Sequence, residues 1–117
     1  MSDLERALGA LAERAGGVRA ALVVETSGIE VACWGRADFE AAAAEWAELW
    51  RQVRAGETLG GADGVASVTI LGARGGWVAL PVGGDYLLLL AFDASVPPGR
   101  ARFYAAQWAR ERGEEFA

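Results

Sequence analysis

The sequence predicts an α+β fold of element order αββαβββα, built on one five-stranded antiparallel sheet with helices on both faces. Glycine and proline divide the 117 residues into eight segments. Three segments carry apolar residues at helical spacing, and five are short apolar runs typical of strands. Two of these runs, residues 21–24 and 87–90, are apolar at every position, so we expect them at the centre of a sheet whose two faces are both covered.

Each predicted helix has recognisable ends. Ser2 and Glu5 form the pattern of a capping box, a leucine stripe follows, and Gly16 ends the first helix. Asp38 can cap the second helix, and Gly56 can end it. The last helix follows the Pro-Pro-Gly segment at 97–99 and ends near residue 113. On the second helix an apolar arc faces the sheet; it consists of Phe39, Ala42, Ala43, Trp46, Leu49, Trp50 and Val53.

Strands are expected at residues 18–25, 29–34, 65–71, 77–82 and 86–92. Short turns connect 18–25 to 29–34, 65–71 to 77–82, and 77–82 to 86–92, so these neighbours should pair as hairpins. With the two fully apolar strands in the middle, the spatial order is 2-1-5-4-3. Residues 29–34 and 65–71 then form the edges of the sheet, and residues 1–117 form a single domain.

The edge strand at 65–71 has no charge, proline or glycine that would protect it from pairing with another chain. Two interpretations fit. The loop at residues 57–64 can cover this edge, or the strand can pair with a second copy of itself across a two-fold axis. The second interpretation predicts a homodimer.

The second helix permits the same dimer. Its acidic side chains lie in the first half and its arginines in the second, so two antiparallel copies would bring opposite charges together. The helix dipole alone also favours this arrangement, and the helix by itself does not distinguish the two explanations. The predicted dimer interface combines both elements: Ala41, Ala44, Glu45, Glu48, Arg51, Arg54, Val65, Ser67, Val68 and Thr69.

Composition excludes several classes of function. The net charge is −5, which argues against nucleic-acid binding. Histidine and lysine are both absent, so the commonest general base, the commonest metal ligand and the P-loop lysine are missing. The glycine-rich segment 60–64 leads into a strand rather than a helix, which does not suit phosphate binding. We therefore expect a protein that is not an enzyme and that binds neither a metal nor a cofactor.

The single Cys33 cannot form an intramolecular disulfide, and this favours the cytoplasm. The longest apolar run, residues 86–92, is too short to insert across a membrane. Five acidic residues lie in turns, at strand ends or on an edge, with no spacing that forces a catalytic pair. Phe103 falls outside the apolar stripe of the last helix, so we expect an exposed aromatic side chain there.

Several short motifs, in this order, resemble the roadblock/dynein light chain family. They are a leucine-striped helix, Gly16-Gly17-Val18 leading into an apolar strand, and the turn Ser27-Gly28-Ile29. Leu59-Gly60 and the entry to the last helix, Gly99-Arg100-Ala101-Arg102, are also similar. The resemblance covers essentially the whole chain. Gly16 replaces a proline that is frequent in the family, and Glu25 replaces an aspartate.

The resemblance implies a roadblock/profilin-like fold and a non-catalytic homodimer, with one sheet continuous across the two-fold axis. Bacterial relatives bind Ras-like small GTPases and regulate their nucleotide cycle, and other relatives act in motor or polarity complexes. The expected function is therefore a homodimeric scaffold or regulator of a small GTPase. The alternative is a small-molecule sensor with a ligand pocket between the sheet and the second helix, lined by Trp46 and Trp50.

Overall fold

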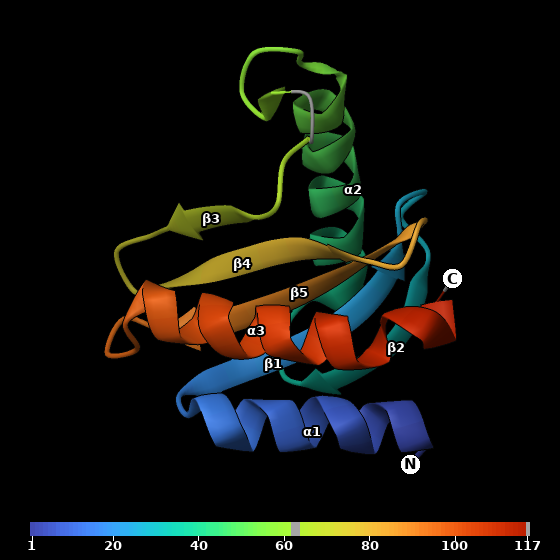
Figure 1. The fold of residues 1–117 in the computed structure, drawn as a ribbon. Coiled ribbons are helices and arrows are strands. Elements are labelled where there is room, and N and C mark those ends of the chain that lie inside the picture. The colour runs from blue at the N-terminus through green and yellow to red at the C-terminus, as the bar shows by residue number, and fades with distance from the viewer. Residues whose placement is uncertain (62–63, 117) are drawn as a thin grey trace.

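The computed structural model describes residues 1–61 and 64–116 (Figure 1). Its elements, in chain order, are α1 (Asp3–Ala15), β1 (Val18–Glu25), β2 (Glu30–Gly35), α2 (Phe39–Ala55), β3 (Val68–Leu71), β4 (Gly75–Val82), β5 (Tyr86–Asp93), α3 (Pro98–Arg112) and the short 3₁₀ helix η2 (Gly113–Phe116). The predicted order αββαβββα is confirmed.

All five strands form one antiparallel sheet of order β2-β1-β5-β4-β3, as predicted. β1 and β5 occupy the centre because their side chains are buried on both faces. Residues 20–24 and 87–90 are completely inaccessible to solvent. Burying apolar surface on both sides of the same strands is the main stabilising contribution to this sheet.

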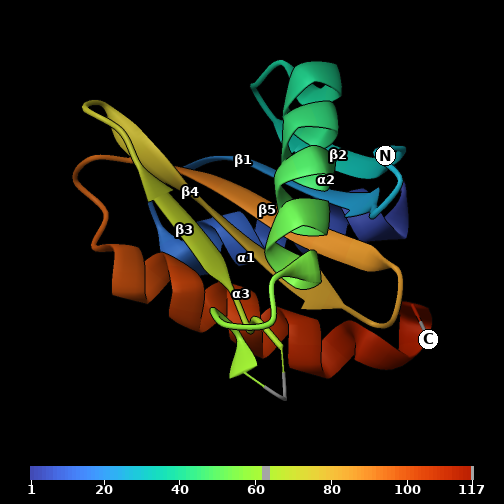
Figure 2. The same ribbon diagram turned by 90° about the horizontal axis from the view of Figure 1, so that it is seen from above.

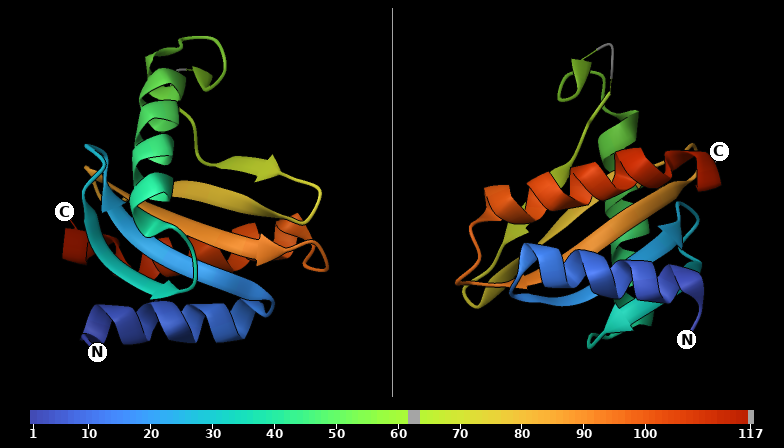
Figure 3. Two further views of the ribbon diagram at one scale, coloured as in Figure 1. Left: turned by 180° about the vertical axis from the view of Figure 1, so that it is seen from behind. Right: turned by 60° about the horizontal axis from the view of Figure 1, so that its bottom comes forward.

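The two faces of the sheet carry different helices (Figures 2 and 3). α1 and α3 lie side by side on one face, where Leu8, Leu11 and Trp108 pack against alternate residues of β1, β4 and β5. On the other face α2 packs Trp46 and Trp50 against Leu22, Leu87 and their neighbours. α2 rises from the sheet, so its C-terminal end and residues 56–61 lie furthest away (Figure 1).

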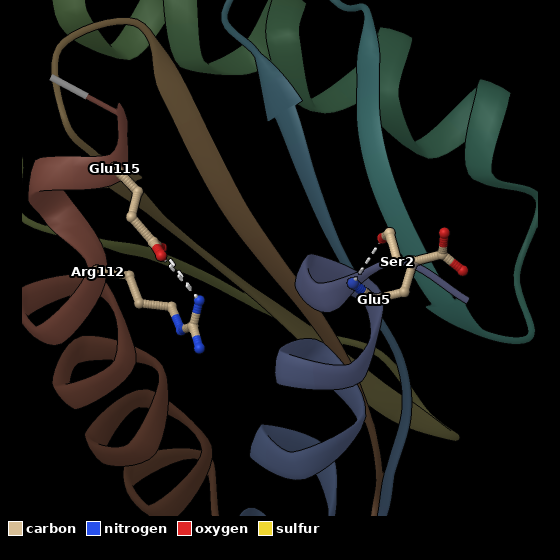
Figure 4. Close-up of polar contacts among 4 residues, drawn as sticks. All are labelled: Ser2, Glu5, Arg112 and Glu115. Carbon is tan, nitrogen blue, oxygen red and sulfur yellow. Dashed lines mark hydrogen bonds and ion pairs between the residues drawn. The ribbon is translucent and has the colours of Figure 1, made fainter.

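The helix ends agree with the predicted caps. The hydroxyl of Ser2 accepts a hydrogen bond of 3.1 Å from the backbone N–H of Glu5 (Figure 4). Asp38 Oδ1 accepts one of 3.1 Å from the N–H of Ala41. Each bond satisfies one of the N–H groups that a helix leaves unpaired at its start. α3 begins differently, because Pro97 at its N-cap position supplies no such side-chain bond.

The strand predicted at 65–71 is too long. β3 contains only Val68–Leu71, and its ladder with β4 begins at the pair Val68↔Ala79. Continuing this register would place Ala66 opposite Pro81, which has no N–H to donate. Val65 and Ser67 therefore lie before the strand, in the segment that descends from the end of α2. None of the described helices is long and apolar enough to cross a bilayer.

Candidate self-association surface

The edge of the sheet at β3 presents a row of backbone groups that pair with no other strand among residues 1–61 and 64–116. β3 has β4 on one side only. Residues 57–61 lie above the sheet, near the end of α2, and residues 64–67 descend to the start of β3 without running along its open edge (Figure 1). Of the two interpretations of this edge, the geometry therefore favours an open strand over one covered by its own loop.

The side chains of β3 alternate between the two faces. Val68 is half-buried and packs against the core beneath α2, and Ile70 points to the same face. Thr69 and Leu71 point to the other face, and Leu71 is 64% exposed. Exposed apolar residues on an unpaired edge are what a second strand would cover.

An apolar groove of about 340 Å³ lies between this edge and α2. Its walls are Asp38, Ala41, Ala42, Glu45, Trp46 and Leu49 of α2 and its cap, with Ile70 of β3 and Trp77 of β4. Ile70 is 45% exposed. The groove and the open edge are contiguous because Ile70 belongs to both, so one partner can bury both together.

The predicted interface residues on α2 divide between two flanks of the helix. Ala41 and Glu45 line the groove beside β3. Ala44 and Glu48 are exposed on the adjoining surface, next to Leu49. Arg51 and Arg54 lie on the other flank, where they line a depression with Thr26 and Ser27 of the β1–β2 turn. Arg51 thus lies away from β3, whereas Arg54 also lines the groove under the C-terminal end of α2 together with Val65, another predicted interface residue.

Charges on α2 pair within the helix. Glu48 Oε2 lies 2.7 Å from Nη1 of Arg51, and Glu48 Oε1 accepts a hydrogen bond of 3.2 Å from Gln52. These contacts follow from the i, i+3 and i, i+4 spacing and need no second chain. Since both groups of the ion pair are more than half exposed, the pair contributes little to stability. The carboxylate of Glu48 is therefore already engaged inside its own helix.

Sequence reasoning misses the apolar part of this surface. Leu49, Ile70 and Trp77 line the groove, yet none is among the ten predicted interface residues. The helical wheel assigns Leu49 to the arc that faces the sheet, but this side chain is only partly buried there. Ile70 is the one that the strand pattern could have identified. Side chains alternate along a strand, so Ile70 lies on the same face as Val68, which packs beneath α2.

Trp46 and Trp50 fill the space between α2 and the sheet. They are 5% and 4% exposed and pack against Leu22, Val24 and Leu89. The sensor hypothesis requires these two indoles to line a hole; both are packed in the core, and each also forms part of the wall of an open groove, Trp46 in the groove beside β3. The second groove, of about 640 Å³, lies under the C-terminal end of α2. Trp50 forms part of its wall and is otherwise buried in the core.

Cys33 lies on β2 as a half-buried side chain whose Sγ donates to Oε1 of Glu30 over 3.7 Å. Burial raises the pKa of this thiol to about 11, and the Glu30 carboxylate acts in the same direction. A thiol with a raised pKa is a poor nucleophile. Within residues 1–61 and 64–116 no three metal-ligating side chains gather in one place.

Several solved structures share this architecture over almost the whole chain. Myxococcus xanthus MglB matches with a TM-score of 0.87 and 18% identity, over 99% of this chain and 96% of that one. A roadblock/LC7 domain from Streptomyces avermitilis matches with a TM-score of 0.86 and 16% identity, over 97% and 98%. Profilin IB from Acanthamoeba castellanii is more distant, with a TM-score of 0.67 and 17% identity over 95% and 97%.

No protein-family model and no curated protein matches the sequence. At identities below 25%, the structural likeness establishes the fold alone. The chain has the roadblock/LC7 fold, which is the roadblock/profilin-like architecture that the motifs predicted.

Proposed function

We propose that this protein is a non-catalytic, cytoplasmic scaffold that forms a homodimer through β3 and α2 and binds a Ras-like small GTPase, whose nucleotide cycle it regulates. The roadblock/LC7 fold and the motif resemblance support the GTPase assignment. The absence of histidine and lysine from the sequence supports a regulatory rather than a catalytic role.

The observation that carries the proposal is the continuity of an open strand edge with an apolar groove. Ile70 is the shared residue, since it lies on β3 and lines the groove. Two copies related by a two-fold axis would pair β3 with β3 and cover both grooves in the same step. Backbone hydrogen bonds then set the register, and apolar burial supplies most of the affinity.

The dimer is tested by solution mass. The native protein should run at twice its 12.3 kDa mass in light scattering, and Ile70→Arg should run as a monomer because it places a charge in the groove and on the edge. Ile29→Arg is the matched control, since Ile29 is 59% exposed but precedes the opposite edge strand β2. A monomeric native protein at micromolar concentration would refute the dimer.

GTPase binding is tested separately, with Ras-like GTPases encoded in the same genome loaded with GDP or with a non-hydrolysable GTP analogue. We expect saturable binding in at least one nucleotide state and a changed rate of nucleotide release or hydrolysis. Binding by native protein and by Ile29→Arg, with loss in Ile70→Arg, would show that the dimer is the binding species. Absence of binding in both states, with the dimer intact, would remove the GTPase assignment and leave the scaffold.

A further inference from the structure

Helix α3 is strongly basic in an acidic protein. It holds four of the eleven arginines and one glutamate, a net formal charge of +3 in a chain whose net charge is −5. Its apolar side is buried against the sheet through Ala101, Ala105, Trp108 and Ala109. Positive charge is therefore concentrated on the remaining, outward side of one helix.

Two of the four arginines have structural roles. Arg112 donates to both carboxylate oxygens of Glu115, at 3.2 and 3.0 Å (Figure 4), and its Cζ lies 5.4 Å from the ring centroid of Trp108. Arg100 reaches the C-terminal end of α1, where Nη2 lies 3.5 Å from the position of a Cβ built on Gly16. A cation beside the carbonyl end of a helix is favourable.

Arg110 lies in the last turn of α3, where the helix dipole favours a cation, but neither Arg110 nor Arg102 is held by a partner side chain from the described part of the chain. Both are exposed, and neither forms an ion pair with any residue within 1–61 and 64–116. Arg102 is the fifth residue of α3 and lies beyond its first turn, so the helix dipole gives no reason for a cation there. α1 and α2 obey the dipole rule, with acids in the first turn and an arginine in the last. Arg102 is thus an exposed cation with neither a helix-end role nor an ion-pair partner among the described residues.

These two arginines lie along one line of the helix surface. Arg102, Ala106 and Arg110 are spaced four residues apart, so the two guanidinium groups leave the helix about 12 Å apart along its axis. Phe103 lies beside Ala106 and is 59% exposed, as the sequence predicted. Arginine and aromatic residues are the types enriched in protein interfaces.

We propose that Arg102, Phe103, Ala106 and Arg110, together called the α3 stripe, dock an acidic segment of a partner protein. Two carboxylates of that segment would pair with the arginines, and an apolar side chain between them would contact Phe103 above the small Ala106. An anionic membrane is the less suitable occupant, because the apolar side of α3 is buried in the core and only one aromatic residue is left to insert.

The α3 stripe is independent of the dimer surface. α3 covers the face of the sheet opposite to α2, so both can be occupied together (Figure 3). In the proposed homodimer two copies of the stripe would lie on the same side of a continuous sheet, and a partner with two acidic segments would gain avidity.

The test uses the full-length protein and a labelled peptide in which glutamates alternate with leucines. We expect saturable binding by fluorescence anisotropy and amide shift changes confined to residues 98–110 by NMR. The double variant Arg102→Glu/Arg110→Glu should weaken binding at least tenfold, and Phe103→Ser should weaken it several-fold.

The matched control is Arg36→Glu/Arg74→Glu, which changes the net charge equally at two exposed arginines outside α3. It should bind within about twofold of native protein. Equal loss in both double variants would reduce the effect to overall charge and overturn the proposal, and so would unchanged binding in Arg102→Glu/Arg110→Glu. Failure of the peptide to bind, or binding to phosphatidylserine vesicles in its place, would also overturn it. Circular dichroism verifies that each variant is folded.

Discussion

At the scale of single residues, Cys33 shows how its surroundings determine reactivity. With a pKa of about 11, only about one thiol in a thousand is ionised at pH 8. We predict slow alkylation by iodoacetamide at pH 8, with a rate that rises about tenfold per pH unit up to pH 10. Mass spectrometry of the quenched reaction measures the rate.

Glu30→Gln is the informative variant. It removes the negative charge that helps to raise the pKa of Cys33, so the rate at pH 8 should increase. Burial is the larger cause and stays in place, so the rate should remain below that of the unfolded protein in denaturant. A native rate equal to the denatured rate would contradict the raised pKa.

Gly83 shows a backbone requirement at one position. Its φ of +64° lies in the left-handed region, and a Cβ there would overlap the backbone carbonyl of Phe116 in η2. We predict that Gly83→Ala lowers the free energy of unfolding by about 1–3 kcal/mol. Chemical denaturation measures the change.

The adjacent Gly84 supplies the control. A Cβ at Gly84 would have no heavy atom within 4 Å beyond its own chain neighbours, and the φ of this residue is not positive. Gly84→Ala should change the free energy of unfolding by less than about 0.5 kcal/mol. Equal effects at both positions would show that the packing of η2 on the β4–β5 turn, including the 5.1 Å contact of Phe116 with Tyr86, is not what constrains Gly83.

At the scale of elements, the cap of α1 makes a separable contribution. Ser2→Ala removes the acceptor for the Glu5 N–H and should cost about 1 kcal/mol of stability, with fraying of the first turn. Hydrogen exchange of the amides at the start of α1 measures that fraying. Ser95→Ala, an exposed serine in the β5–α3 connection, should leave exchange and stability unchanged.

The elements also show what the sequence can predict and what it cannot. Sheet order follows from two strands that are apolar on both faces, since only central strands can bury both sides. The residue at which β3 begins cannot be predicted from residues 65–71 alone, because all of them are typical of a strand. Pro81 of the neighbouring strand β4 ends the pairing before Val68. The length of β3 therefore depends on the sequence of its neighbour β4 as well as on its own.

The candidate surface is predicted in location but not in full composition. An edge strand without charge, proline or glycine identifies β3, and the charge order of α2 identifies the helix. Which flank of α2 faces β3 depends on how the helix lies on the sheet, and a helical wheel does not contain this information. The wheel therefore assigns Arg51 to the same side as Glu45, although Glu45 lines the groove beside β3 and Arg51 lines the depression beside the β1–β2 turn.

At the scale of the whole molecule, the two proposed surfaces differ in physical character, and this difference is a prediction about salt. The β3 edge and its groove offer backbone groups and apolar side chains, and the Glu48–Arg51 ion pair of α2 is intrahelical. The α3 stripe offers two guanidinium groups, unpaired within residues 1–61 and 64–116, around one phenylalanine. Dissolved salt screens the charge–charge interactions of the α3 stripe much more than the apolar and backbone contacts of the β3 edge.

We therefore predict that about 1 M NaCl leaves the dimer mass unchanged by light scattering, because apolar burial is not weakened by salt. The same salt should lower the affinity of the glutamate–leucine peptide at least tenfold. If the dimer instead dissociates in salt while Ile70→Arg remains dimeric in low salt, exposed charges on α2 hold the two copies together. β3 would then pair with nothing, and the sheet continuous across two copies would have to be abandoned.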